Sequence, residues 1–144
     1  MRKDSRLSRV LHVLIHLNRS DGPVTSETLA NMLATNPVVV RRTMALLRTQ
    51  GYVQSSKGHN GGWALTKPLA DISLLDIHNA LSESSIFTIG LTDEHNNCPI
   101  EIAVNEALKD VMNEAENLML KRFGEITLDK LEQGSTGHPV NLRS

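Results

Sequence analysis

The feature that most constrains the fold is a glycine-rich stretch, SKGHNGGWAL (residues 56–65), which holds three of the nine glycines and the only tryptophan of the chain. Short, partly alternating segments lie at residues 52–55 and 63–66. Two such segments joined by a glycine-containing connection indicate a β-hairpin. Any fold for this chain must therefore place one hairpin among segments whose patterns are mostly helical.

The segment before the hairpin carries clear helix signals. Asn36 is a strong N-cap residue, and Pro37 suits the first helical position because its missing N–H would have no partner there. Gly51 supplies the left-handed residue that ends a helix, so we expect a helix over residues 37–50. Its buried face is predicted to comprise Val40, Met44 and Leu47.

Two helices are expected before this one. The first covers residues 5–18, where apolar residues recur every three or four positions, and the second is short and begins after Thr25 or Ser26. A short helix, a tight connection and a capped helix form a helix-turn-helix unit. A plain helical hairpin is the alternative. The β-hairpin that follows favours a winged helix-turn-helix.

Three more helices are expected after the hairpin. The first opens over residues 72–77 with an approximate capping box. A second cap-and-proline signal at residues 97–99 opens a long helix over residues 99–123, with Gly124 as its stop. A short helix over residues 128–133 follows, capped by Thr127 and ended by Gly134. The fold class is therefore mainly α, with one hairpin (α+β).

Charge is divided unevenly along the chain, although the net formal charge is −1. Residues 1–70 hold ten Lys and Arg against three Asp and Glu, whereas residues 71–144 hold five against thirteen. A basic half beside an acidic half indicates a module that binds a polyanion, joined to a part with another role. A chance partition of surface charge is the alternative.

The position of a residue within a helix-turn-helix unit determines whether it can contact DNA. The second helix of the unit enters the major groove with its N-terminal residues toward the base edges, and the helix start at Asn36 attracts phosphate. Arg41 and Arg42 can each bond guanine O6 and N7. Val38 can contact a thymine methyl group, and Arg48 is expected nearer the DNA backbone.

The hairpin is predicted to act as the wing, with its tip at the adjacent minor groove or DNA backbone. Lys57 supplies charge, and His59 and Asn60 supply hydrogen-bond donors. Glycines such as Gly61 let the backbone approach phosphates closely and adopt positive φ. Trp63 is expected to pack the wing onto the body. A P-loop is the alternative, but its spacing and Lys-Ser/Thr ending are missing.

Four stretches carry a resemblance to a known family, at residues 36–42, 46–53, 58–65 and 73–77. They resemble the Rrf2 family of bacterial winged-helix transcriptional regulators, which includes IscR, NsrR and CymR. The resemblance covers about residues 5–123, and the wing is its most specific part. It implies a homodimer, paired through the long C-terminal helix, that binds a near-palindromic operator as a repressor.

The long helix carries an apolar seam that fits the implied dimer. The seam repeats at threes and fours over about five turns, which is longer than packing on its own domain requires. Packing within the chain is the alternative. The predicted dimerisation residues are Ile100, Val104, Leu108, Val111, Ala115 and Leu118.

Several family members hold an iron–sulfur cluster on three cysteines before the dimer helix. This chain has Cys98 alone, so we expect no such cluster and predict no cofactor. A thiol at a helix N-terminus has a lowered pKa and higher reactivity, which suits a redox sensor. The alternative is that Cys98 caps the helix or packs in the core.

The elements divide the chain into four predicted parts. They are a winged helix-turn-helix DNA-binding domain (1–82), a loop (83–98), a dimerisation helix with a short terminal helix (99–133) and a flexible tail (134–144).

Other functions find less support in the sequence. His12 and His16 could share a metal ion, but without a third ligand a solvated or DNA-facing pair is favoured, and no metal site is predicted. No nucleophile–base pair indicates an enzyme. No apolar run approaches the about 18 residues of a membrane span, and the start lacks a signal peptide, so we expect a cytoplasmic protein without a membrane partner.

A protein-binding module on a winged-helix scaffold, without DNA activity, is the main alternative function. Such a module would have its partner on the acidic half. Duplex binding at different salt concentrations separates it from a DNA-binding regulator, because counterion release from DNA predicts strong salt dependence. The sequence specifies neither the operator nor a small-molecule effector.

Overall fold

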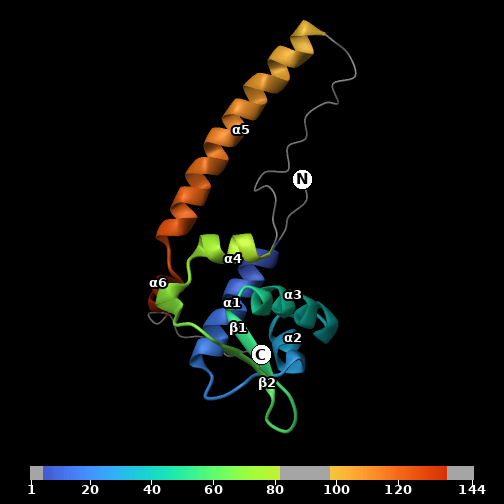
Figure 1. The fold of residues 1–144 in the computed structure, drawn as a ribbon, viewed down its shortest axis with the longest axis vertical. Helices are drawn as coiled ribbons and strands as arrows, with labels where there is room; N and C mark the ends of the chain where they lie inside the picture. Colours follow the sequence, from blue (N-terminus) through green and yellow to red (C-terminus); the bar gives the residue numbers. More distant parts are fainter. Residues whose placement is uncertain (1–4, 82–97, 136–144) are drawn as a thin grey trace.

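The computed structural model describes residues 5–81 and 98–135 (Figure 1). Except for Cys98, the loop predicted over residues 83–98 lies outside these residues, as does the tail predicted over residues 134–144 beyond Ser135. The mainly helical class with a single hairpin is confirmed. In chain order the described elements are α1 (Arg6–Arg19), α2 (Ser26–Met32), α3 (Pro37–Thr49), β1 (Val53–Ser56), β2 (Gly62–Leu65), the 3-10 helix η1 (Leu69–Asp71), α4 (Leu74–Ala80), α5 (Pro99–Glu125) and α6 (Leu128–Ser135).

The start of α3 follows the predicted cap. The Asn36 side chain accepts a hydrogen bond from Val39 N at 3.0 Å, and Pro37 occupies the first turn. The turn between α2 and α3 uses a positive φ of 52° at Ala34. Gly51, with φ of 81°, follows the C-cap residue, so α3 ends one residue earlier than predicted.

The wing, defined here as β1, β2 and the connection between them, is an antiparallel hairpin. Val53 pairs with Leu65 and Ser56 pairs with Gly62, so each strand lies one residue from its predicted position. Val24, just before α2, also bridges to Trp63, with Val24 N donating to Trp63 O at 3.0 Å and Trp63 N to Val24 O at 2.8 Å. The wing is thereby tied by its backbone to the segment that leads into α2.

One hydrophobic core joins the helices to the base of the wing. The predicted buried face of α3 is confirmed, because Val40, Met44 and Leu47 are all buried. Leu128 of α6 is fully buried in the same core. The largest fully buried side chains are Leu14, Leu29, Met44, Leu47, Val53, Ile72, Ile77, Leu81 and Leu128.

The chain after α5 returns to the body beside the start of α4. Leu74 N donates to Ile126 O and Leu128 N donates to Ile72 O, both at 2.9 Å. The predicted capping box of α4 is present, since Ser73 and Asp76 exchange side-chain and backbone hydrogen bonds. This pairing fixes where α5 ends relative to the core.

Two predicted helix stops are wrong. Gly124 lies inside α5, which continues to Glu125, and Gly134 lies inside α6. A glycine within a helix costs only about 1 kcal/mol relative to alanine, so it need not end one. The extended Ile126 ends α5 instead, where its carbonyl bonds the backbone of α4.

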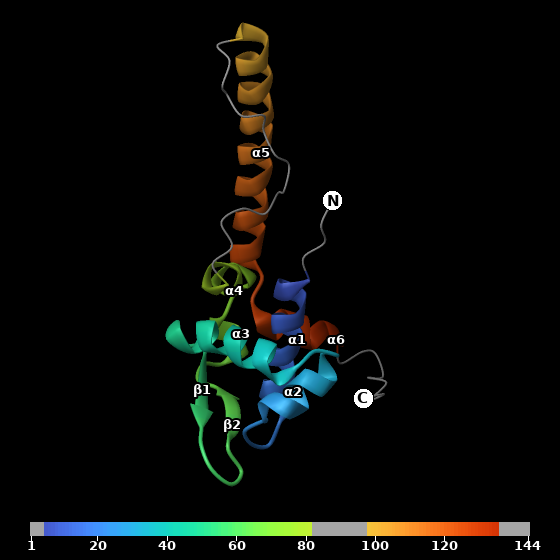
Figure 2. The ribbon, with the colours of Figure 1, turned by 90° about the vertical axis from the view of Figure 1, so that its right-hand side faces the viewer.

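The molecule is elongated. α5 extends away from the body formed by the other elements, and the wing projects from the opposite end (Figures 1 and 2). No helix among residues 5–81 and 98–135 is both long and apolar enough to cross a membrane.

Candidate nucleic-acid interface

The start of α3 presents apolar and basic side chains to solvent. Val38 is 56% exposed, and Asn36, Arg41 and Arg42 are also exposed. Val39 is a further exposed apolar side chain, which no sequence pattern indicated as a DNA contact. A helix start that exposes valines beside arginines can contact both base methyl groups and base acceptors.

Arg41 has an acidic neighbour that the sequence did not reveal. Its Nη1 lies 3.6 Å from Oε1 of Glu27, in the first turn of α2. The two residues lie 14 positions apart, and only the packing of α2 on α3 brings them together. Both side chains are more than half exposed, at 53% for Arg41 and 67% for Glu27.

Arg48 lies between α3 and the wing. Its Nη1 donates to Ser55 Oγ at 3.3 Å, and its guanidinium carbon is 5.8 Å from the centre of the Trp63 ring. The residue remains exposed. Arg48 therefore links α3 to the wing through contacts that no local sequence pattern indicated.

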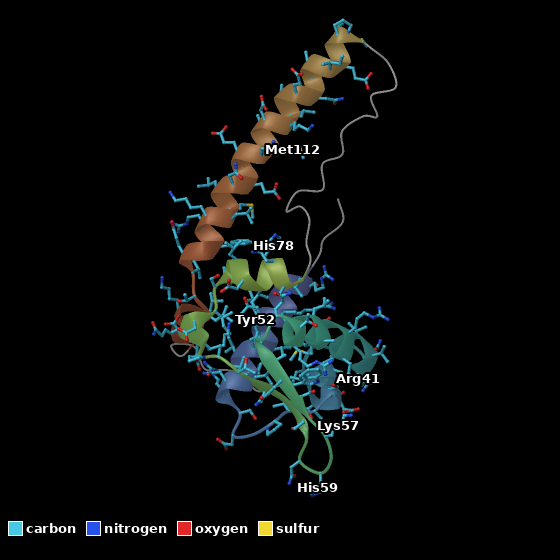
Figure 3. The ribbon with its side chains drawn as sticks, viewed as in Figure 1. Arg41, Tyr52, Lys57, His59, His78 and Met112 are labelled. Carbon is cyan, nitrogen blue, oxygen red and sulfur yellow. The ribbon has the colours of Figure 1, made fainter. Side chains whose placement is uncertain are left out.

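The wing tip carries the three polar residues predicted to contact DNA. Lys57, His59 and Asn60 are exposed, and Figure 3 shows Lys57 and His59 at the same end of the molecule as Arg41, opposite α5. Asn60 has φ of 65° and Gly58 has φ of 89°, and Gly61 N donates to Gly58 O at 3.0 Å. The tip is a tight turn that places one basic and two polar side chains outward.

Trp63 anchors the wing, as predicted. The residue is 7% exposed, and its Nε1 donates to Ser26 Oγ of α2 at 2.9 Å. Because both groups are buried, each satisfies a donor or acceptor that would otherwise cost free energy.

Gly61 and Gly62 also have a role inside the fold, which is separate from the predicted approach of the wing to phosphate. A Cβ at Gly62 would lie 2.5 Å from Val24 O, and a Cβ at Gly61 would lie 2.5 Å from Ser56 O. Both glycines therefore permit close packing within the protein.

A shallow hollow of about 260 Å³ separates the wing from α2 and α3. It is open to solvent. The residues that line it are Thr25, Ser26, Glu27, Arg41, Ser55, Ser56, Gly58, Gly61, Gly62 and Trp63.

His12 and His16 form a hydrogen-bonded pair on α1, with their Nε2 atoms 2.8 Å apart. Partial burial, the neighbouring His12 and, to a lesser degree, Arg19 lower the pKa of His16. Within residues 5–81 and 98–135, no three His, Cys, Asp or Glu side chains are grouped so that they could hold a metal ion.

Cys98 is exposed at the start of α5, so the alternative that it packs in the core is wrong. The backbone N–H groups of Glu101 and Ile100 lower the pKa of its thiol. Cys98 is the N-cap residue of α5, and its side chain makes no hydrogen bond of cap geometry.

The apolar seam of α5 lies on the surface of the single chain. Five of its six predicted members are exposed, from 43% at Leu108 to 76% at Ile100, and Ala115 is half-buried. Large apolar side chains exposed in a row indicate an interaction surface.

The chain matches the Rrf2 family, described as an iron-dependent transcriptional regulator, over residues 4–133. It is 32% identical over 116 residues to the Bacillus subtilis protein named "Putative HTH-type transcriptional regulator YwnA", which covers 81% of this chain and 86% of that protein. The family match includes α1 to α5, the wing and most of α6.

Solved structures agree with the fold. A Lactobacillus plantarum protein described as a "putative transcriptional regulator" superposes with a TM-score of 0.77 at 28% identity, covering 93% of this chain and 91% of that one. The IscR of T. potens superposes with a TM-score of 0.70 at 20% identity, covering 98% and 93%. The related proteins are helix-turn-helix regulators rather than enzymes. The chain belongs to the Rrf2 family of transcriptional regulators.

Proposed function

We propose that the protein is a homodimeric, sequence-specific DNA-binding repressor that acts in the cytoplasm on a near-palindromic operator. The observation that carries the DNA-binding part is the common exposure of the α3 start and the wing tip at one end of the molecule (Figure 3). The repressor role follows the family resemblance.

In this proposal α3 enters the major groove and the wing tip meets the adjacent minor groove or phosphates. Arg41 and Arg42 donate hydrogen bonds to guanine, and Val38 contacts a thymine methyl group. Lys57, on the exposed tip, neutralises phosphate.

The dimer is proposed to form through α5. Its exposed seam runs along the helix that stands clear of the body, and an apolar surface of this kind gains free energy when a second copy covers it (Figure 1). A two-fold dimer presents two α3 helices, so it reads two half-sites.

The family description includes iron, but this chain does not fit an iron–sulfur cluster. The sequence contains one cysteine, Cys98, where the family-type cluster needs three thiolate ligands. We therefore propose that the regulator works without such a cluster.

Substitutions in the interface test the proposal. Arg42→Ala should cost about 1–3 kcal/mol and relax the preference at one base pair. Lys57→Ala should weaken binding to all sequences and reduce the slope of log affinity against log salt by about one. The measurement is fluorescence anisotropy with a duplex selected from a random pool, at several salt concentrations. Lys121→Ala, an exposed substitution on α5, is the matched control.

Two results would contradict the assignment of this interface. The first is wild-type binding that shows no salt dependence, which favours the protein-binding alternative. The second is unchanged affinity in both interface variants.

We also propose that Cys98 senses oxidants. The thiol is exposed, and the helix start lowers its pKa, which raises the fraction of reactive thiolate. Oxidant treatment should then change the operator affinity of the wild-type protein and leave that of Cys98→Ser unchanged. Equal sensitivity of both proteins would rule out this sensor.

A further inference from the structure

Glu27 places a negative charge beside the residues proposed to contact DNA. It lies in the first turn of α2, which is capped by Thr25 through a 3.1 Å hydrogen bond from Thr28 N. A carboxylate there opposes phosphate binding, because DNA carries a dense negative charge. If Glu27 contributes to DNA binding, its contribution must therefore outweigh this repulsion of the phosphates.

The contact between Glu27 and Arg41 is too exposed to contribute much to folding. Exposed ion pairs of this kind have little effect on stability. The position of the Glu27 carboxylate matters for another reason. It attracts the Arg41 guanidinium of α3 to one place before DNA binds.

The carboxylate meets one edge of the guanidinium. Glu27 Oε1 lies 3.6 Å from Arg41 Nη1, and both side chains border the hollow between α2, α3 and the wing. A guanidinium is a planar fork with several N–H donors. A carboxylate held at one nitrogen leaves other donors available for acceptors of a base.

We propose that Glu27 is the positioning residue of Arg41 and, through it, a determinant of sequence specificity. Glu27 orients the guanidinium toward the O6 and N7 acceptors of one guanine and disfavours its use as a phosphate contact. This inference rests on the proposed function, since it requires α3 to meet DNA.

Glu27→Gln tests the proposal because the amide keeps the shape of the side chain and removes its charge. Affinity for the selected operator should fall, since Arg41 loses the carboxylate that orients its guanidinium. Affinity for random duplex should rise, since a repulsive charge is lost. The ratio of the two affinities should fall by at least about fivefold, the factor that corresponds to 1 kcal/mol. The preference for guanine at one position of each half-site should relax.

Two controls isolate the pair. Glu106→Gln makes the same charge change at an exposed position of α5, away from the wing, and should leave the affinity ratio unchanged. In the Arg41→Ala background, Glu27→Gln should no longer change the guanine preference, because the oriented group is gone. The thermal unfolding midpoint of each variant verifies that the fold is intact.

The outcomes separate this inference from the function on which it rests. If Glu27→Gln changes affinity for operator and random duplex by the same factor, Glu27 is not a specificity determinant. If its effect on the ratio persists without Arg41, the positioning role is wrong. If the wild-type protein binds no duplex, the proposed function fails before any variant is compared, and the role of Glu27 fails with it.

Discussion

Trp63 ties three parts of the DNA-binding body together at the scale of one residue. Its indole donates to Ser26 of α2, its ring lies beneath the Arg48 guanidinium of α3, and its backbone pairs with Val24. Each contact is modest, about 1 kcal/mol for a neutral hydrogen bond. Together they fix the wing relative to α3, so the wing and α3 form one preformed surface.

His16 should make stability depend on pH. Its pKa in the folded protein lies below 6.5, so the unfolded chain binds more protons between that lowered pKa and 6.5. The contribution of His16 to the stability of the fold is therefore fully present above pH 6.5. It is lost as the pH falls through the pKa of His16 in the folded protein. His16→Gln should remove this component, which thermal unfolding between about pH 7.5 and 5 measures.

His59→Gln, on the exposed wing tip, is the matched control and should leave the pH dependence as in the wild type. A wild-type pH profile that persists in His16→Gln would show that other groups cause it.

The elements are held by close backbone approaches as well as by side chains. The wing lies against the residues before α2, where a Cβ at Gly62 would meet Val24 O at 2.5 Å and Val24 C at 2.6 Å. Gly62 also has φ of 148°, which L side chains rarely adopt. A single glycine thus controls how closely the wing docks.

Gly62→Ala should destabilise the fold by roughly 1–3 kcal/mol, because backbone atoms must move to relieve the contact. The free energy of unfolding in urea measures it. Gly22→Ala is the matched control: a Cβ there has nothing within 4 Å, so its effect should stay within about 0.5 kcal/mol. Equal effects of the two substitutions would contradict the close approach.

Local signals in the sequence predicted the elements well. The cap at Asn36 and the capping box at Ser73 depend on residues three positions apart, so the sequence contains everything they need. The pairing of Trp63 with Ser26 joins residues 37 positions apart. Such a partner depends on how helices pack, and no local pattern specifies it. The same reason explains why the Glu27–Arg41 contact was missed.

At the scale of the whole molecule, the candidate dimer surface lies on α5, which extends away from the body that carries the candidate DNA surface (Figure 2). The body reaches α5 through the Ile126–Leu74 and Leu128–Ile72 hydrogen bonds and through the buried Leu128. A partner docked along α5 would thereby set the spacing of two recognition helices. The C-terminal end of α5 is linked to the core by backbone contacts that the sequence pattern did not indicate.

Leu108→Glu should convert the proposed dimer to monomer, because a carboxylate at the centre of an apolar interface would be buried without a partner. Light scattering after size exclusion measures the mass, which should fall by half at micromolar concentration. Lys109→Ala, the adjacent exposed residue, should remain dimeric. A wild-type protein that is already monomeric, or a Leu108→Glu variant that stays dimeric, would contradict pairing through this seam.

The central claim, that this chain reads DNA as a two-fold dimer, is tested most directly by selecting bound sequences from a pool of random duplexes. The account predicts enrichment of a near-palindrome whose half-sites lie about one helical turn, or a multiple of it, apart. Arg41→Ala should lose the preference at one position in each half-site. Failure of the wild-type protein to enrich any sequence above the starting pool, at low and at moderate salt, would contradict the claim.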